Sequence, residues 1–302
     1  MIELRHVTKR YGAVEALHDV SFRAPEGQIV GLLGQNGAGK STTLNILTGY
    51  LPPTSGQVLV DGMDLLQNAR ECKRLIGYLP EKPPLYDEMT VRAYLRFVCE
   101  LKEVQKSAIA AHVEDIIRTC GLSEVAHRLI GHLSKGYRQR VGVAQSLCGN
   151  PKVLVLDEPT VGLDPRQVVE IRALIADLGK THTVILSSHI LSEVQSVCDR
   201  VLIIAHGRLV AQGTPEELAA RLTAKGTITA TAQGSREEIL AAAGTVPGLT
   251  NLTVTEEKGG EVSFTAVSTE GTDLRGALSQ ALAGAGCPVL DLRAETMSLE
   301  DV

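Results

Sequence analysis

The sequence predicts an α/β protein in which a mainly parallel sheet is covered by helices, followed by a smaller α+β domain. Three observations lead to this prediction. Short β-rich runs alternate with helix-like segments over residues 1–222, as in parallel-sheet folds. Two of these runs are nearly continuous in apolar residues and end in polar ones, as buried central strands do. A glycine-rich turn joins one run directly to a helix-like segment, at the edge of the sheet where such proteins bind ligands.

Five segments of the first domain are predicted to be strands, because each is rich in β-branched or aliphatic residues. They are Gln28–Leu33, Gln57–Val60, Val153–Leu156, Thr183–Ser187 and Arg200–Ile204. Residues 65–130 have a different character, with helical periodicity at Val91, Leu95 and Val98. We therefore expect a helical subdomain over about residues 65–130, inserted into the α/β core.

A second domain is predicted for residues 226–302, because the composition changes there to Thr, Ala and Gly. Its predicted strands and helices are Thr227–Ala232, a helix from Ser235, Leu252–Thr255, Glu261–Ala266, Asp273–Ala283 and Pro288–Leu292. This β-α-β-β-α-β order is the ferredoxin-like plan. The helix from Ser235 has Glu238 three residues on, a capping-box pattern. The last residues, 298–302, resemble the first turn of a further helix.

Composition and charge exclude several classes of protein. Of the 302 residues, 44% are hydrophobic and 22% charged, which is typical of a folded globular protein. The formal net charge of −5 provides no general attraction for nucleic acid, so no such partner is expected. No apolar run approaches the roughly 20 residues of a membrane span. The N-terminal residues lack the plan of a signal peptide, and the six cysteines lack metal-binding spacing, so we expect a cytoplasmic location with reduced thiols.

A phosphate-binding loop is the most specific motif. Residues 34–41 read G-x-x-x-x-G-K-S and lie between a predicted strand and a helix-like segment. Glycines let successive backbone N–H groups turn toward an anion, and the following helix adds its positive N-terminal end. Lys40 would neutralise the β- and γ-phosphates, and the Ser41 hydroxyl would face Mg²⁺. The expected nucleotide contacts are Gly34, Asn36, Gly37, Ala38, Gly39, Lys40, Ser41 and Thr42. A glycine-rich structural turn is the alternative interpretation.

Two adjacent carboxylates, Asp157 and Glu158, follow the apolar strand Val153–Leu156. Two acids at the end of a buried strand are costly unless a cation or a substrate compensates them. We expect Asp157 in the coordination sphere of Mg²⁺ and Glu158 as the general base that polarises the attacking water. A solvated acidic turn is the alternative, and the presence of a phosphate loop argues against it.

Upstream of the acidic strand, Leu133–Tyr137 resembles the signature loop of ATP-binding-cassette (ABC) transporters, usually Leu-Ser-Gly-Gly-Gln. Other marks of that family occur in the same order. Tyr11 lies where an aromatic ring stacks on adenine, and Val161–Asp164 resembles the D-loop. His189 lies where a switch histidine contacts the γ-phosphate. The chain, over residues 1 to about 215, is thus similar to the ATP-binding subunit of an ABC transporter.

The resemblance implies a fold, an activity and partners. The fold would be a P-loop NTPase cassette, and the activity hydrolysis of ATP with Mg²⁺, with Lys40, Glu158 and His189 as catalytic residues. Two cassettes of this family pair head to tail. ATP on one phosphate loop would therefore be closed over by Ser134 and Gly136 of the other cassette, with Asp164 of the D-loop also among the contacts. Separate membrane permease subunits would hold the chain at the cytoplasmic face of the cell membrane.

Two departures from the family pattern occur. Glu81 occupies the position that usually holds a glutamine, and its carboxylate could still face Mg²⁺. Lys135 and Tyr137 replace the usual Gly and Gln of the signature loop, and we expect the loop to work with altered strength. The combination of Tyr78–Glu81, Leu133–Tyr137 and the C-terminal residues 298–302 resembles the ABC-2, exporter-like branch, including gliding-motility and drug-export systems. The segment Glu81–Tyr86 is expected to dock a short helix of the membrane partner.

Two other functions remain as alternatives. The first is a cassette ATPase that acts on ribosomes or nucleic acid, although such proteins usually carry two cassettes or a long coiled coil. This chain has one phosphate loop and an acidic charge balance. The second is a nucleotide sensor that does not hydrolyse ATP, which Lys40, Asp157 and Glu158 argue against.

Overall fold

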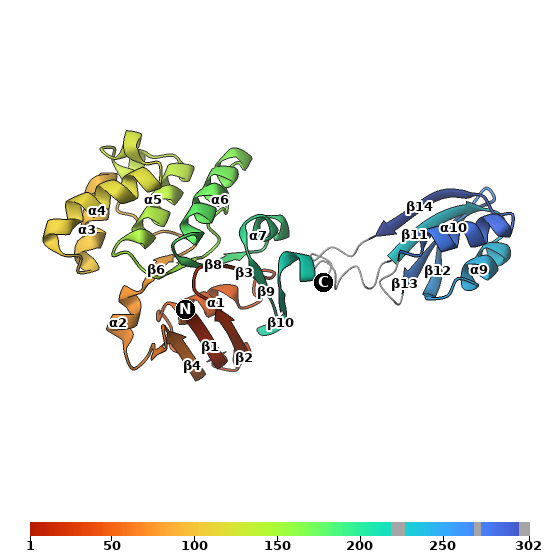
Figure 1. Ribbon diagram of the computed structural model, residues 1–302, viewed down its shortest axis with the longest axis horizontal. Helices are drawn as coiled ribbons and strands as arrows, with labels where there is room; N and C mark the ends of the chain where they lie inside the picture. Colours follow the sequence, from red (N-terminus) through yellow and green to blue (C-terminus); the bar gives the residue numbers. More distant parts are fainter. Residues whose placement is uncertain (219–226, 269–272, 296–302) are drawn as a thin grey trace. The chain divides into compact units, whose positions relative to one another are not determined.

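The computed structural model describes residues 1–218, 227–268 and 273–295 (Figure 1). Contacts divide the chain into two units, Met1–Pro215 and Glu216–Val302. The predicted boundary between residues 222 and 226 falls outside the described residues, as does the expected helical turn at 298–302. Among the helices that are described, none is both long and apolar enough to cross a lipid bilayer.

The core of the first unit is a six-stranded sheet with the order β10-β9-β3-β8-β7-β6. All neighbouring pairs are parallel except β9 and β10, which form an antiparallel edge. The strands are β3 (Ile29–Leu33), β6 (Ile76–Leu79), β7 (Val153–Leu156), β8 (Thr183–Ser188), β9 (Arg200–Ala205) and β10 (Arg208–Gly213). The three central strands are buried at every position, which explains their unbroken apolar or small-residue sequences. Their carboxyl ends carry the site described below.

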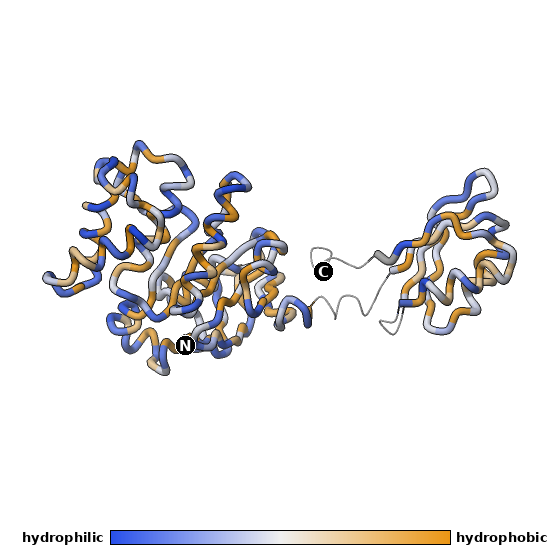
Figure 2. The backbone as a smooth tube through the Cα atoms, turned by 45° about the horizontal axis from the view of Figure 1, so that its top comes forward, coloured by the Kyte–Doolittle hydropathy of each residue, from blue (hydrophilic) through white to orange (hydrophobic). Residues whose placement is uncertain are grey.

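A second, antiparallel sheet was not predicted. Its order is β2-β1-β4-β5, and its strands are β1 (Ile2–Tyr11), β2 (Val14–Ala24), β4 (Ser55–Val60) and β5 (Met63–Asp64). The prediction that Gln57–Val60 belongs to a mainly parallel sheet is therefore wrong, because β4 pairs antiparallel with β1. One apolar cluster joins the two sheets through α1, and it includes Leu32, Leu44 and Val58. Figure 2 shows the hydrophobic residues concentrated along the inner strands.

Seven helices with described bounds accompany these sheets: α1 (Lys40–Leu47), α2 (Ala69–Arg74), α3 (Val91–Leu101), α4 (Lys106–Thr119), α5 (Lys135–Leu147), α6 (Pro165–Gly179) and α7 (Leu191–Val197). Short 3-10 helices occur at Ser123–Val125 and Ile130–His132. Helices α3, α4 and α5 pack against one another and form the helical group drawn in yellow and green in Figure 1. Strand β6 lies inside the stretch 65–130 but pairs with β7, so that part of the expected insertion belongs to the core sheet.

The second unit has the order β-α-β-β-α-β, with the antiparallel sheet β12-β13-β11-β14. Its elements are β11 (Thr227–Gln233), α9 (Arg236–Gly244), β12 (Leu249–Lys258), β13 (Glu261–Ser268), α10 (Arg275–Gly284) and β14 (Val289–Glu295). This is the ferredoxin-like arrangement. Ser235 and Glu238 form the capping box that begins α9. The fully buried Phe264 lies in a core shared with both helices.

Candidate functional site

The phosphate loop connects β3 to α1 and has the backbone that its glycines predict. Gly37 and Gly39 adopt φ angles of +80° and +109°, which side chains with a Cβ rarely adopt. At Gly34 the constraint is space, because a Cβ there would lie 2.3 Å from the Ile204 carbonyl oxygen. Inside the loop, Lys40 Nζ donates to the Gly34 carbonyl at 2.7 Å. The loop is thus folded around a cation at the N-terminus of α1.

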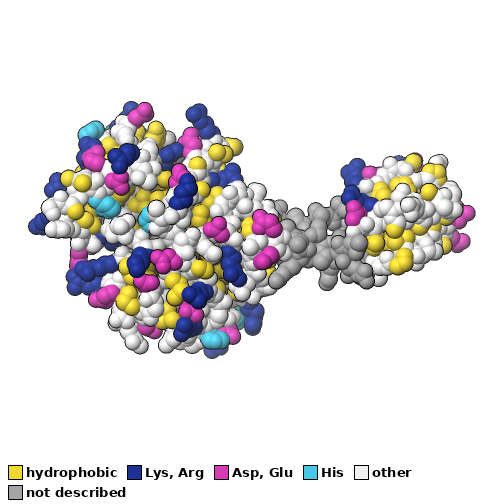
Figure 3. Space-filling view, viewed as in Figure 1, with side chains coloured by type: hydrophobic (Ala, Val, Ile, Leu, Met, Phe, Trp, Pro, Cys, Tyr) yellow, Lys and Arg dark blue, Asp and Glu magenta, His cyan; other side chains and the backbone are white. Residues whose placement is uncertain are grey.

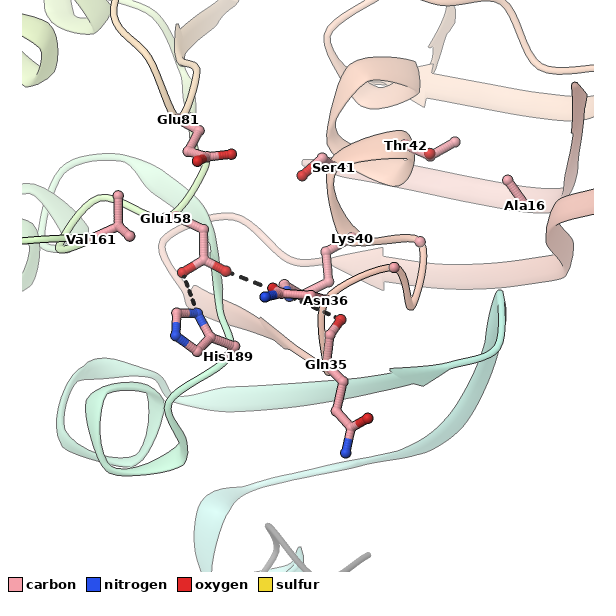
Figure 4. Close-up of a pocket in the computed structure, with 12 residues that line it drawn as sticks. Ala16, Gln35, Asn36, Lys40, Ser41, Thr42, Glu81, Glu158, Val161 and His189 are labelled. Atoms are coloured by element: carbon pink, nitrogen blue, oxygen red, sulfur yellow. Dashed lines mark hydrogen bonds and ion pairs between the residues drawn. The ribbon is translucent and has the colours of Figure 1, made fainter.

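A cleft of about 280 Å³ lies in front of this loop (Figure 4). The predicted residues Asn36, Gly37, Gly39, Lys40, Ser41, Thr42, Glu81, Glu158 and His189 line it. Three residues that were not predicted also line it: Ala16, Gln35 and Val161. Figure 4 shows side chains from the phosphate loop, from α1 and from the segments that follow β6, β7 and β8, together with Ala16 from β2. The structure therefore brings segments from five parts of the sequence to one place.

Asp157 and Glu158 follow β7 as predicted, and both are buried. Asp157 Oδ1 accepts a hydrogen bond from Ser187 Oγ at 2.6 Å and lies 3.4 Å from Ser41 Oγ. The Ser187 hydroxyl in turn accepts from the Glu158 N–H at 2.9 Å. Hydroxyl groups therefore satisfy the buried Asp157 carboxylate, and they place it beside the serine of the phosphate loop.

Glu158 lies between two nitrogen groups. Its Oε1 is 3.5 Å from Lys40 Nζ, and its Oε2 is 2.9 Å from His189 Nδ1. These partners reduce the desolvation cost of a buried carboxylate. Glu158 also has a φ of +47°, an uncommon left-handed conformation for a residue with a side chain. The chain turns sharply here, so that Asp157 and Glu158 face different parts of the site.

The oxygen donors in the cleft fit Mg²⁺. The Ser41 hydroxyl and the Asp157 carboxylate are adjacent, and Figure 4 shows Glu81 facing Ser41 across the cleft. Among the described residues, no group of three or more His, Cys, Asp or Glu side chains is suited to hold a metal ion. Mg²⁺ is often bound through one or two carboxylates together with substrate phosphates and water. The site suits a metal that arrives with a nucleotide, held by Ser41 and Asp157.

Tyr78 is a partly buried group beside this site that the sequence did not single out. Its hydroxyl donates to Asn45 Oδ1 at 3.1 Å. Burial, with a further contribution from the Asp157 charge, raises the pKa of Tyr78 to about 12. The phenol therefore stays protonated and connects β6 to α1 beneath the phosphate loop.

Three predicted residues do not line the cleft. Ser134 is the N-cap of α5 and accepts from the Tyr137 N–H, while Asp164 is the N-cap of α6 and accepts from the Gln167 N–H. Ser134 and Gly136 instead line a separate cleft of about 460 Å³, together with Gln167. A Cβ on Gly136 would lie 2.5 Å from the Gln167 side chain. The signature-like loop thus lines a different cleft from the phosphate loop of its own chain.

Four further predicted residues also lie outside the cleft lining, namely Gly34, Ala38, Asp157 and Tyr11. Ala38 is buried within the phosphate loop. Tyr11 ends β1 and is 46% exposed, with Lys9 Nζ 5.3 Å from its ring centroid. The ring therefore has a cation nearby, and its exposed part is accessible to a planar group such as a base. Its position neither confirms nor contradicts a role in stacking.

Sequence reasoning also missed the residues that hold the loops of the site. Gln139 Nε2 donates to the Pro159 carbonyl at 2.8 Å, and both partners are buried. Thr160 and Ser188 each donate to Glu193. The serine pair before His189 was visible in the sequence. Nothing in the sequence, however, indicates that Glu193 reaches back to it.

Comparisons with known proteins agree with this geometry. A family model described as ABC transporter matches residues 17–161, which include the phosphate loop and the acidic pair. The chain is 39% identical over 218 residues to YxlF of Bacillus subtilis (strain 168), an uncharacterized ABC transporter ATP-binding protein, and the match covers 72% of each chain. It is 37% identical to the bacitracin transport ATP-binding protein BcrA of Bacillus licheniformis, over 70% of this chain and 68% of BcrA.

A solved structure is similar to this chain over a comparable share of its length. It is the dimeric structure of a post-hydrolysis state of the ATP-binding cassette MJ0796 bound to ADP and Pi. The TM-score is 0.65 at 25% identity, covering 71% of this chain and 99% of that one. The fold around the cleft is thus that of a protein solved with the products of ATP hydrolysis.

Proposed function

This chain belongs to the ABC transporter family of ATP-binding proteins, and we propose that it is the ATP-hydrolysing motor subunit of an exporter. The observation that carries the proposal is the cleft lined by Lys40, Ser41, Glu158 and His189, with Asp157 next to Ser41. A phosphate loop alone would indicate only a nucleotide. The buried base beside the lysine adds the means to hydrolyse it.

Each group in the cleft has a distinct part in hydrolysis. The N–H groups of the loop and Lys40 bind the β- and γ-phosphates, displacing the Lys40 ammonium from the Gly34 carbonyl that it now contacts. Bound Mg²⁺, held by Ser41 and Asp157, supplies charge compensation for the phosphates. Glu158 accepts a proton from the attacking water, and His189 holds the carboxylate through the 2.9 Å contact.

A second cassette completes the site. Ser134 and Gly136 belong to a different cleft from the phosphate loop of the same chain. The Ser134 side chain caps α5, so the N–H groups at that helix terminus form a second anion cradle. Head-to-tail pairing of two copies places this cradle over the exposed side of the ATP. Binding then favours the paired state and hydrolysis releases it.

Membrane subunits are the second kind of partner. None of the described helices could cross a bilayer. In the proposed assembly, permease subunits cross the membrane. The segment 81–86 and α3 offer these subunits a surface. Tyr86 is 47% exposed, and its ring centroid lies 5.7 Å from that of Phe97 and 5.9 Å from that of Tyr94. The face drawn in Figure 3 mixes basic and acidic side chains rather than gathering basic ones. That mixture favours a protein partner over nucleic acid.

The proposal includes a direction of transport and a location. Similarity to BcrA, a bacitracin transport ATP-binding protein, supports an exporter. Bound to its permease, the chain would lie at the cytoplasmic face of the cell membrane. Mg²⁺ and ATP are the cofactors that the site requires.

Co-purification tests the proposal. The tagged chain is isolated from cells after detergent extraction, and what accompanies it is identified by mass spectrometry and by RNA electrophoresis. The proposal expects an integral membrane protein in amounts comparable with the chain. Ribosomal RNA or ribosomal proteins without such a protein would instead indicate an ATPase that acts on ribosomes. The Lys40→Ala variant, which should not hydrolyse ATP, is the matched control for the activity of the purified complex.

A further inference from the structure

Glu193 bridges the two loops that carry the proposed catalytic pair. Its Oε2 accepts one hydrogen bond from Thr160 Oγ1 at 2.7 Å and another from Ser188 Oγ at 3.0 Å. Thr160 lies two residues after Glu158, and Ser188 directly precedes His189. Thr160 and Ser188 are buried and Glu193 is partly buried, so these hydrogen bonds are partly shielded from competing water. One carboxylate oxygen thus ties the end of β7 to the end of β8.

The loop after β7 needs such support. Glu158 has a φ of +47°, and this strained conformation of a residue with a side chain persists only where surrounding contacts impose it. Two of those contacts are hydrogen bonds. The Glu158 N–H donates to the Ser187 hydroxyl, and the Gln139 side-chain amide donates to the Pro159 carbonyl. The hydrogen bond from Thr160 to Glu193 is a third, and it comes from a different element, α7.

The hydrogen bonds of Glu193 also restrain the backbone around His189. The Ser188 hydroxyl donates to Glu193 and accepts from the Ile190 N–H at 3.0 Å, so the backbone on both sides of His189 is fixed. On α7 the Glu193 side chain is in the first turn, and the buried Leu191 and Val194 anchor the helix. The carboxylate is therefore held in place from its own side as well.

We propose that Glu193 is a positioning residue for ATP hydrolysis. By holding Thr160 and Ser188 together, it keeps Glu158 Oε2 and His189 Nδ1 in contact at 2.9 Å. The inference rests on the proposed function, because it assumes that Glu158 acts on the attacking water. Neither Glu193 nor Thr160 lines the nucleotide cleft. Loss of the bridge therefore affects turnover and leaves nucleotide affinity in place.

A simpler role for Glu193 is to stabilise α7, because its negative charge lies near the positive N-terminal end of the helix dipole. Substitution with Gln separates the two roles. Glu193→Gln removes the charge but keeps a carbonyl oxygen with two lone pairs, which can accept from both hydroxyl groups. Glu193→Ala removes charge and acceptor together. A positioning role predicts that Glu193→Gln keeps most of the turnover and that Glu193→Ala does not. A helix-dipole role predicts that both substitutions change the turnover equally.

The decisive variants are Glu193→Ala and Thr160→Val in the purified full chain, assayed for ATP turnover, apparent KM and melting temperature. Thr160→Val keeps the shape of the side chain and removes only the donor. Each should lower kcat by about 10- to 100-fold with an unchanged KM, which is the scale of a catalytic group misplaced by about 1 Å. The double variant should lose no more than Glu193→Ala alone, because that substitution already removes the hydrogen bond from Thr160.

Ser196→Ala is the matched control. Ser196 is on the same helix and donates to the Glu193 carbonyl while accepting from Arg172, so its removal weakens α7 without touching the bridge. Its kcat should match the unaltered chain. Unchanged kcat in both Glu193→Ala and Thr160→Val, or additive losses in the double variant, would overturn the inference. An unaltered chain with no ATP hydrolysis at all would instead overturn the proposed function.

Discussion

His189 and Glu158 are joined by a contact of 2.9 Å between Nδ1 and Oε2, across the ends of the neighbouring strands β8 and β7. The other carboxylate oxygen of Glu158 lies 3.5 Å from Lys40 Nζ. Both oxygens of the buried carboxylate are thus matched to nitrogen groups. When phosphate oxygens draw Lys40 away, Oε1 becomes available to the attacking water.

Glu158→Gln should abolish most of the hydrolysis. The amide keeps the size of the side chain but cannot accept a proton from water, so turnover should fall by roughly 10²- to 10⁴-fold. ATP affinity should stay within a few fold, because the phosphate loop is unaltered. Phosphate release and equilibrium binding of a fluorescent ATP analogue measure the two effects. Near-normal phosphate release would remove Glu158 from the role of base.

Gly39→Ala should damage the phosphate loop through its backbone. A Cβ at this position would lie 2.8 Å from Leu17 Cδ2 and 3.0 Å from the Ala16 carbonyl, at a φ of +109°. We expect a loss of about 1–3 kcal/mol in the free energy of unfolding together with weaker ATP binding. Gly62→Ala is the control, because Gly62 has a φ of +82° and no atoms within 4 Å. It should lose stability and keep its affinity for ATP; a similar loss of affinity in both variants would contradict the account.

Tyr11→Ala should weaken the apparent affinity for ATP without changing the chemical step. An aromatic ring stacked on a base contributes at most about 1–3 kcal/mol, so the apparent KM should rise and kcat should stay constant. Tyr11→Phe keeps the ring and should behave like the unaltered chain. Steady-state kinetics over a range of ATP concentrations give both constants. An unchanged KM in Tyr11→Ala would show that the ring does not stack on adenine.

Removal of Mg²⁺ should stop hydrolysis, because the carboxylates and the phosphates in the cleft would lack a compensating cation. Titration of Mg²⁺ back into chelator-treated protein should restore it. In Glu81→Gln the half-saturating Mg²⁺ concentration should rise by about tenfold if Glu81 supports the metal through water. A curve that superimposes on that of the unaltered chain would exclude Glu81 from the metal site.

The local motifs of the site could be predicted from the sequence, because each lies in one short segment. The glycine-rich loop and the two acids after β7 are of this kind, and the strand order then brings Lys40 and Glu158 together. The bridge made by Glu193 could not be predicted, since it joins side chains from three separate segments. Hydrogen bonds of that kind do not produce a recognisable pattern of residues in the sequence.

The antiparallel sheet was missed for a different reason. Strand β1 buries Ile2, Leu4 and Val7, so the two-residue alternation breaks between Leu4 and Val7. The register of β1 against β2 shifts at the same place, and His6 has a φ of +52°. A bulge of this kind adds a residue and shifts the side chains that follow to the other face. Strand prediction that relies on strict alternation fails there.

The account depends on ATP held between two copies of the chain, and the molar mass of the Glu158→Gln variant tests it most directly. Light scattering is measured with and without saturating ATP and Mg²⁺. We expect a monomer near 32.2 kDa without nucleotide and twice that mass with it, because bound ATP is no longer consumed. A monomer under both conditions, with no pairing in the presence of the membrane partner, would contradict the account.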